Sequence, residues 1–451
     1  MPWYLPLASI ISATMFILAI RGLASPQTAR QGNLLGIVGM IIAISTTIAS
    51  PQINDWLLPL FIMIIGGIIG IYIALNVKMT DLPQMIAIFN GLGGLSAVLI
   101  ALAEIISGSN NRIDNSIGII IGAIAFSGSM IAFGKLQGLI TAKPIKFKAQ
   151  HILNLSLGLG TLIISLIFIY THSLNLFYCL AILTIILGIL LVLHIGGADM
   201  PVVISILNSY SGWAAVGIGF SLNNILLIIV GSIVGASGAI LSYIMVKAMN
   251  RSLLNVIIGG INDNNAHNSS SEQKIAKSGT PQDAAFIMEN ANKIIIVPGY
   301  GMAVAQAQYV LKEMADILQN RYQVEVKYAI HPVAGRMPGH MNVLLAEANV
   351  PYEDVFAMED INREFATADV AYVIGANDIT NPIAKTDSSS PIYGMPVLDV
   401  EKAKTVFFVK RSLASGYSGV ENPLFFADNT LMLYGDAKQI TEQIVSALES
   451  N

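Results

Sequence analysis

The stretch that decides the fold is KIIIVPGYGMAVAQAQ, Lys293–Gln308. A short apolar run leads into a glycine-rich turn, and the turn leads into a helical pattern. A strand, a glycine turn and a helix in this order commonly hold a nucleotide pyrophosphate, because the turn lets the backbone approach and the helix start offers free amides. The stretch therefore predicts a nucleotide-binding α/β fold around it.

The sequence before this stretch is of a different kind. The chain has 451 residues, 54% hydrophobic and 12% charged, against roughly 25% charged in an average soluble domain. Residues 261–281 are polar and lack periodicity, which is typical of a tether. We therefore predict a transmembrane domain at 1–260, a flexible linker at 261–281 and a nucleotide-binding domain at 282–451.

The first part contains nine apolar stretches close to the length of about 20 residues that a membrane-spanning helix needs. Lys and Arg gather in alternate loops, and the opposite loops hold only Arg112. This bias places the N-terminus outside and the C-terminal domain in the cytoplasm. The predicted spans are Tyr4–Ile20, Leu34–Ala49, Trp56–Ala74, Met85–Ala103, Ile117–Phe133, Ile152–Tyr170, Leu176–Ile195, Met200–Phe220 and Ile225–Val246.

After the linker, strands and helices alternate, which indicates a doubly wound parallel sheet that binds its ligand at the carboxyl ends of the strands. We expect strands at Lys293–Val297, Val324–Ile330, Asp354–Met358, Val370–Ile374, Thr405–Lys410 and Leu431–Tyr434, and helices at Met302–Asn320, Met341–Glu347, Asp360–Ala366 and Ala437–Leu448.

The strand ends indicate which nucleotide is bound. Gly299, Gly301 and Val304 fit the glycine fingerprint with its third position relaxed. An NAD site usually has a carboxylate after the second strand, but that strand ends in YAIHPVAGR. Lys410 and Arg411 end a later strand and suit a 2′-phosphate, unless they are simply a solvated strand end. The pattern favours NADP.

Other chemistries fit the sequence poorly. A net charge of −4 argues against nucleic-acid binding, and the single Cys179 excludes disulfides and thiolate metal sites. Haem would need ligands on facing helices, whereas the histidines of the membrane part lie near span ends. Asn90, Asn208 and Asn224 lie within or beside apolar spans, which favours a hydrated path through the bundle over plain helix packing.

Long strings of this sequence resemble the beta subunit of the proton-translocating nicotinamide nucleotide transhydrogenases, over nearly the whole chain. They include GGADMPVV, LNSYSGWAA, PGYGMAVAQAQ, HPVAGR, PGHMNVLLAEA, IGAND and ENPLFF. The resemblance implies an NAD(P)+ transhydrogenase of the Si-specific/Re-side proton-translocating type, active only with an alpha subunit. NADP(H) would be bound by this chain and NAD(H) by the partner, with direct hydride transfer that normally forms NADPH from NADH, and with no metal, flavin or haem.

The resemblance also implies a setting: a bacterial inner membrane, an alpha subunit that is one chain or two, and a dimer of alpha-beta units. Site residues follow from the matched motifs. The cofactor would be bound by Gly299, Tyr300, Gly301, Met302, Ala303, Val304, His331, Arg336, Gly375, Asn377, Asp378, Lys410, Arg411, Gly416 and the lid residue Tyr417. Proton movement and coupling would involve Asp378 near the nicotinamide, with Asn90, Asp199, Asn224 and Arg251.

One position departs from the family. Some members have a histidine in the fourth span where this chain has Asn90. Asparagine cannot take up a proton near neutral pH, so the sequence predicts a water chain ordered by Asn90. Two other functions fit the composition: a nucleotide-gated channel or transporter that catalyses no reaction, and a membrane-bound NADP-dependent reductase, although no flavin or haem signature accompanies the latter.

Overall fold

The computed structural model describes residues 4–23, 26–49, 57–108, 111–141, 143–171, 173–258, 276–337, 339–416 and 418–450. The chain forms two compact units: Met1–Ile195 with Val203–Ser242, and Gly196–Val202 with Tyr243–Asn451. Most of the predicted linker lies outside the described residues. Residues 276–281 are described and bind the edge of the sheet, where the Met432 amide donates to the Lys277 carbonyl at 2.8 Å.

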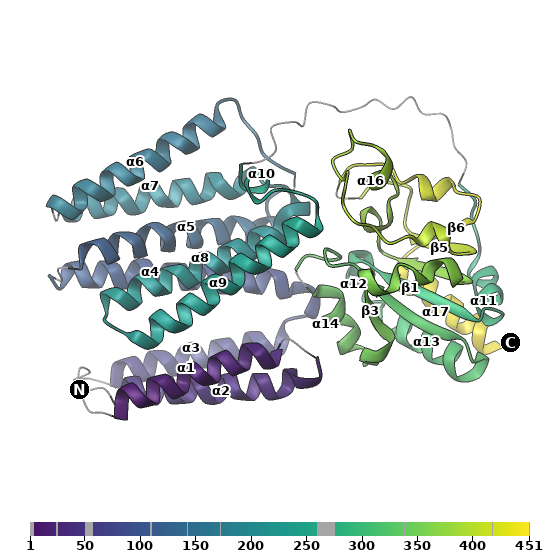
Figure 1. The fold of residues 1–451 in the computed structure, drawn as a ribbon, viewed down its shortest axis with the longest axis horizontal. Coiled ribbons are helices and arrows are strands. Elements are labelled where there is room, and N and C mark those ends of the chain that lie inside the picture. Colours follow the sequence, from purple (N-terminus) through teal and green to yellow (C-terminus); the bar gives the residue numbers. More distant parts are fainter. Residues whose placement is uncertain are drawn as a thin grey trace. The chain divides into compact units, whose positions relative to one another are not determined.

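Nine helices in the described part of the chain are long and apolar enough to cross a membrane, as predicted. Their closest neighbours pair α1 with α2, α4 with α5, α5 with α7, and α6 with α7 (Figure 1). The helices are α1 Tyr4–Leu23, α2 Pro26–Ile48, α3 Leu57–Asn76, α4 Leu82–Ile106, α5 Arg112–Leu136, α6 Gln150–Thr171, α7 Leu174–Leu193, α8 Met200–Ser221 and α9 Ile225–Ala248; a short α10, Leu253–Ile258, follows.

A buried lysine closes one helix end in this bundle. Lys135, the penultimate residue of α5, is 3% exposed. Its ammonium donates to the carbonyl of Leu193, the last residue of α7, at 2.5 Å and to the carbonyl of Ile195, just beyond that helix, at 2.7 Å. These carbonyls have no partner within their own helix, and an unpaired ammonium would be costly in an apolar setting. The contact therefore satisfies both groups and fixes where α7 ends.

The C-terminal domain contains six parallel strands in the order β3-β2-β1-β4-β5-β6, which confirms the doubly wound sheet. The order reverses between β1 and β4, and ligands of such sheets bind at that point. The strands are β1 Lys293–Pro298, β2 Glu325–Ile330, β3 Val355–Ala357, β4 Val370–Ile374, β5 Thr405–Lys410 and β6 Thr430–Tyr434; the helices are α11 Pro281–Glu289, α12 Tyr300–Ala305, α13 Gln308–Tyr322, α14 His340–Glu347, α15 Met358–Ile361, α16 Ile383–Thr386 and α17 Ala437–Ser450.

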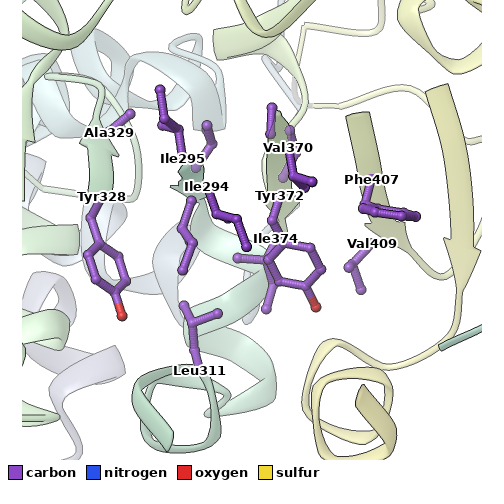
Figure 2. Close-up of a cluster of buried hydrophobic side chains, with 14 of the residues drawn as sticks. Ile294, Ile295, Leu311, Tyr328, Ala329, Val370, Tyr372, Ile374, Phe407 and Val409 are labelled. Atoms are coloured by element: carbon purple, nitrogen blue, oxygen red, sulfur yellow. The ribbon is translucent and has the colours of Figure 1, made fainter. Parts of the chain in front are cut away.

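The central strands are buried on both faces, as their unbroken apolar runs require. Figure 2 shows Tyr328 and Tyr372 on the side of the sheet that Leu311 of α13 covers. The Tyr372 hydroxyl lies 3.1 Å from the Thr441 hydroxyl of α17, so a buried polar group has a partner. Burial raises the pKa of both tyrosines, which keeps them neutral.

The helix predictions need correction at three places. The helix expected at Asp360–Ala366 is a short α15, Met358–Ile361, followed by a separate 3-10 turn at Glu364–Thr367. The single helix expected at Met302–Asn320 is two, α12 and α13, because Gln306 adopts a left-handed backbone with φ of 52°. Helix α11 was not predicted, although its start carries a clear signal. The Thr280 hydroxyl accepts from the Asp283 amide, the Asp283 carboxylate accepts from the Thr280 amide, and Pro281 lies between them.

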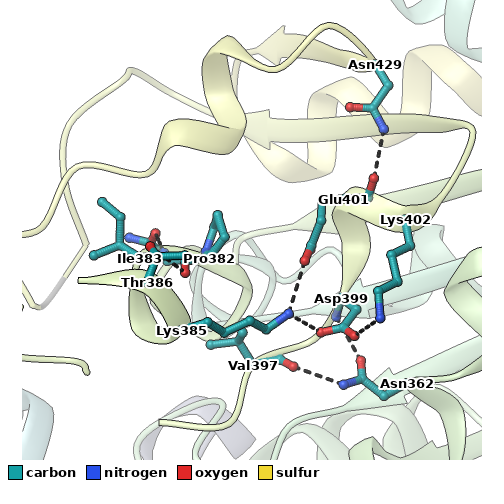
Figure 3. Close-up of polar contacts among 11 residues, drawn as sticks. Asn362, Pro382, Ile383, Lys385, Thr386, Val397, Asp399, Glu401, Lys402 and Asn429 are labelled. Carbon is teal, nitrogen blue, oxygen red and sulfur yellow. Dashed lines mark hydrogen bonds and ion pairs between the residues drawn. The ribbon is translucent and has the colours of Figure 1, made fainter. Parts of the chain in front are cut away.

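A polar network fixes the segment that leads into β5 (Figure 3). The Asp399 carboxylate accepts from Lys385 and, at 2.5 Å, from Lys402. The Asn362 side chain accepts from the Asp399 amide at 2.8 Å and donates to the Val397 carbonyl at 3.1 Å. Burial alone would raise the pKa of the Asp399 carboxyl, but the two lysines outweigh it and hold that pKa below its ordinary value.

We expect Asp399→Asn to lower the free energy of unfolding of this domain by about 1–3 kcal/mol at neutral pH, because two ammonium groups lose a charged acceptor. The folded-state pKa is lowered, so the stabilisation is complete above the unfolded pKa of about 3.9 and is lost as pH falls through the folded pKa. Thermal unfolding of the purified chain measures both effects. Glu442→Gln, which removes an exposed pair with Lys438, should change stability little.

Candidate functional site

The loops after β1 and β4 touch backbone to backbone. The Gly299 amide donates to the Ile374 carbonyl at 2.9 Å, and the Gly301 amide donates to the Gly375 carbonyl at 2.8 Å. A Cβ at Gly301 would lie 2.6 Å from the Gly375 Cα, and one at Gly375 would lie 2.1 Å from the Met302 amide. Glycine is therefore required on both loops, since any side chain would force the two strand ends apart.

These loops form one wall of a pocket at the carboxyl ends of β1, β4 and β5. Most of the predicted cofactor residues line it, although they come from segments far apart in the sequence. They are Gly299, Tyr300, Gly301, Val304, Arg336, Gly375, Asn377, Asp378, Lys410, Arg411 and Gly416. Val333, Ala334, Gly335, Ile379, Ser412, Ser415 and Ser418 also line it and were not predicted from the sequence.

Of the predicted cofactor residues that the structure describes, three do not line this pocket. Met302 and Ala303 are fully buried in the hydrophobic core, so any contact they make with a nucleotide would come from their backbone. His331 is 1% exposed; it accepts from the Val333 amide at Nδ1, and its Nε2 lies 2.7 Å from the Pro396 carbonyl. Burial lowers the pKa of His331 to about 4, so it is a neutral ring that fixes the loop after β2. Tyr417 lies outside the described residues.

Asp378 ties two walls of the pocket together. Its carboxylate accepts from the Ser418 amide at 3.0 Å and from the Ser418 hydroxyl at 2.7 Å. Asn422, which is fully buried, donates to the side-chain oxygen of Asn377 at 3.2 Å. Asn381 donates to the Glu421 carbonyl at 3.1 Å. The segment 411–422, which contains the predicted lid, is therefore held against the loop that follows β4.

An arginine lies flat on an aromatic ring at the other side of the pocket. The Arg336 guanidinium is 4.2 Å from the centre of the Tyr300 ring, and the His340 ring lies 6.0 Å from it. His340 is buried and accepts from the Arg336 amide at Nδ1. Burial, and then the nearby Arg336, lower the pKa of His340 to about 4. Arg336 therefore keeps the only charge in this group at neutral pH.

The end of β5 supplies two more positive charges. Lys410 donates to the Ala414 carbonyl and lies 4.6 Å from the Phe425 ring. Burial lowers the pKa of the Lys410 ammonium, although Asp378 opposes the shift. Arg411 is largely exposed and forms an ion pair with Asp436 at 2.7 Å. An anionic ligand bound here would be attracted by both cations and repelled by the nearby Asp436 carboxylate.

The predicted membrane residues have distinct surroundings. One nitrogen of Arg251 contacts both carboxylate oxygens of Asp199, at 3.0 and 2.9 Å, and this ion pair is partly buried. Asn224 precedes α9, and its side-chain oxygen accepts from the Leu227 amide at 3.1 Å, so it caps that helix. Asn90 lies on the buried face of α4, and its amide nitrogen has no hydrogen-bond partner among the described residues.

The chain combines a multi-pass helical domain with a parallel sheet whose cation-lined pocket lies where the strand order reverses. These features define the class of membrane proteins that carry a nucleotide-binding domain. A family model described as NAD(P) transhydrogenase beta subunit matches residues 5–447. The NAD(P) transhydrogenase subunit beta of Rhodospirillum rubrum is 59% identical over 456 residues, covering 98% of each chain, and the same protein of a second strain matches equally. The chain belongs to the NAD(P) transhydrogenase beta subunit family, which confirms the resemblance seen in its motifs.

We expect Gly301→Ala to weaken nucleotide binding by about 1–3 kcal/mol, because the added methyl group must push the two loops apart. A titration of the purified chain with nucleotide, read by intrinsic fluorescence, measures the loss. Gly279→Ala is the matched control, since its Cβ would meet nothing nearer than 3.4 Å. Equal affinities in both variants would contradict the role given to Gly301.

Asp378→Asn should loosen the segment 411–422, because a carboxamide cannot accept from both the amide and the hydroxyl of Ser418 as a carboxylate does. A hydrogen bond to a charged group is worth about 1.5–3 kcal/mol, so amide hydrogen exchange in this segment should rise about tenfold or more. Asp387→Asn removes a similar contact with Ser389 elsewhere and should leave exchange in 411–422 unchanged.

Proposed function

We propose that this chain binds NADP(H) at the pocket and exchanges hydride directly with NAD(H) on an alpha subunit, coupled to proton movement across the membrane. The observation that carries the choice of nucleotide is the charge at the strand ends. Lys410 and Arg411 follow β5, whereas His331, Pro332 and Val333 follow β2. A 2′-phosphate gains charge-assisted hydrogen bonds at the first place, and no carboxylate repels it at the second.

The pocket suits a dinucleotide phosphate in two further ways. Arg336, Lys410 and Arg411 give its lining an excess of positive charge over the carboxylate of Asp378. The side-chain amide nitrogen of Asn377 is buried there without a partner among the described residues, so it is a donor ready for a ligand oxygen. Because Gly301 donates its amide to Gly375, contacts with phosphate fall mainly to these side chains.

The proposed reaction is consistent with the residues around the pocket. Hydride would pass directly between NADP(H) bound here and a second nicotinamide, and this transfer moves no substrate proton, so the protein must position the rings and exclude water. His331 and His340 fit this requirement. Both are neutral, and both use a ring nitrogen to hold the loop after β2.

The second nucleotide site is assigned to the alpha subunit, in one chain or two, and the working unit to a dimer of alpha-beta pairs. The only strand, glycine turn and helix pattern outside the membrane part of this sequence is the one at Lys293–Gln308. We place the protein in the bacterial inner membrane with its N-terminus outside, following the Lys and Arg bias of its loops. NADH would normally reduce NADP+ in this setting.

Coupling requires two states that differ in protonation and in their hold on NADP(H). The Asp199–Arg251 pair is suited to such a switch, because a bidentate ion pair at the end of the membrane helices weakens if its carboxylate takes a proton. Asp378 is suited to respond at the nucleotide pocket, since its carboxylate holds the segment 411–422 closed. We propose that these two contacts change together, while Asn90 and Asn224 line the proton path.

The test is to reconstitute the chain with its alpha subunit in vesicles and follow reduction of an NAD analogue by NADPH, with and without a proton gradient. We expect hydride exchange whose rate responds to the gradient. Ion flux in the absence of the alpha subunit, without any hydride exchange, would instead identify a nucleotide-gated channel and overturn the proposal.

Lys410→Ala and Arg411→Ala should each weaken NADPH binding by about 1.5–3 kcal/mol, the worth of a hydrogen bond to a charged group, and leave the weak binding of NADH unchanged. Calorimetric titration of the full chain with both nucleotides measures the difference. Lys438→Ala removes a charge from the exposed face of α17 and serves as the control. If both nucleotides lost the same amount of binding affinity, these residues would not be the ones that recognise the 2′-phosphate.

A further inference from the structure

A carboxylate takes part in a buried hydrogen-bonded group in the membrane domain. The Ser221 hydroxyl, at the end of α8, lies 2.8 Å from the side-chain oxygen of Asn115 on α5 and 3.3 Å from a carboxylate oxygen of Glu104 on α4. Asn111 donates to the Ser221 carbonyl at 2.6 Å. Ser221 and Asn115 are 4% and 2% exposed, so this contact is shielded from solvent.

The hydrogen count in this group depends on the protonation of Glu104. The Ser221 hydroxyl has one hydrogen but faces two acceptors, Glu104 and Asn115. A protonated Glu104 resolves the conflict by donating to Ser221, which then donates to Asn115. If Glu104 is ionised, the hydrogen bonds are satisfied equally well once the side-chain amide of Asn115 is flipped. The Asn115 nitrogen then donates to the Ser221 hydroxyl, and that hydroxyl donates to Glu104. The Asn115 amide nitrogen is buried without a partner among the described residues, so it is available for this second arrangement.

Glu104 lies on the same face of α4 as Asn90. The buried stripe of this helix runs through Asn90, Gly94, Ala97 and Ala101, and Glu104 follows at the next helical spacing. Fourteen residues separate Asn90 from Glu104, which is about four turns or about 21 Å of helix. Asn90 and Glu104 therefore stand at two separate depths of one stripe, and Gln84 is a further buried polar residue near the start of the helix.

The facing helix repeats this spacing. Asn115 and Ser129 of α5 are also fourteen residues apart, and both are buried. Ser129 lies beside Gly91, since a Cβ built there would be 3.2 Å from the Ser129 Cβ. The Ser129 hydroxyl and the Asn90 amide nitrogen have no hydrogen-bond partner in the part of the chain that the structure describes. Both depths therefore contain buried polar groups with hydrogen-bonding capacity to spare.

The helices touch between these two depths. A Cβ at Gly94 would lie 2.5 Å from the Gly122 carbonyl, and one at Gly122 would lie 2.7 Å from the Gly94 carbonyl. Ala97 and Ala101 continue the contact and are 1% exposed. An apolar constriction of this kind excludes water, as in gates that close by dewetting. In this conformation, a proton at Glu104 would be separated from the depth of Asn90.

We propose that Glu104, with Ser221 and Asn115 as its hydrogen-bond relay, takes up and releases the translocated proton at the end of the membrane domain where α4 and α8 finish. This inference rests on the proposed function, and it supplies the proton-binding group that Asn90 cannot be. The step forms one O–H bond on a carboxylate oxygen with a proton from water, breaks it again on release and moves no electrons.

Other charged groups near this end are few. The first turn of α5 carries Arg112 and Asp114, and Arg112 donates to the Ile169 carbonyl of α6 at 3.1 Å. The last two turns of α8 and the first two of α9 contain no titratable side chain. The titratable groups that the structure describes at the adjacent ends of α6 and α7, namely Tyr170, Tyr178 and Cys179, are all exposed, and His172 lies outside the described residues.

The test uses the chain reconstituted with its alpha subunit in vesicles that contain a pH-sensitive dye. Glu104→Gln should slow proton translocation by about a hundredfold, the usual effect of removing a proton-transfer group. Glu104→Asp should retain more of the rate than Glu104→Gln. Asp114→Asn removes a carboxylate from the same end of the bundle and should stay close to the wild-type rate. The melting temperature and the NADP(H) affinity of all variants should match those of the wild type.

Infrared difference spectra between acid and alkaline pH report on the carboxyl group itself. A protonated carboxyl band present in the wild type and in Asp114→Asn, and missing in Glu104→Gln, supports the assignment. Proton translocation by Glu104→Gln at the wild-type rate would overturn it, as would an equal loss in Asp114→Asn. If the wild type exchanges hydride but moves no protons, the coupling proposed above fails and the role of Glu104 falls with it.

Discussion

The nucleotide-binding domain depends on one close approach, the contact between the backbones that leave β1 and β4. Gly299 and Gly301 on one loop and Gly375 on the other have no side chain, so amides of the first loop reach carbonyls at the end of β4 and on the second. A pocket forms at this point because the order of the strands reverses there. The glycines are therefore needed by the protein's own architecture as well as by any phosphate that approaches them.

The membrane domain obeys a related constraint. Polar side chains in an apolar medium are costly unless they have partners, and here several are buried with hydrogen-bonding capacity unused. Asn90 and Ser129 lie at one depth of α4 and α5 and Asn115 lies at another, and glycine and alanine bring the two helices into contact between them. This arrangement suits the proton path proposed above, which would need polar groups at both depths and a closed segment between them.

Both domains thus use small residues to bring backbone together, and both have polar side chains beside that contact. The coupling proposed above would act through charged contacts, the ion pair of Asp199 with Arg251 and the hydrogen bonds of Asp378 with Ser418. Such contacts are strong when paired and weak when one partner is neutralised, so a single proton can change their free energy appreciably. Apolar packing, which does not depend on charge, could not transmit that change.

The sequence determined the spans and the strands, since both are written in hydrophobic runs whose length and period leave few alternatives: β4 and β5 begin and end where their runs do. It also determined most of the pocket residues, because the carboxyl ends of parallel strands must meet. Only the tertiary structure decided which partner each polar group takes. No local sequence pattern encodes which residues come together in these contacts. Examples are the ion pair of Arg411 with Asp436, the burial of His331, the break at Gln306 and the relay from Glu104 through Ser221 to Asn115.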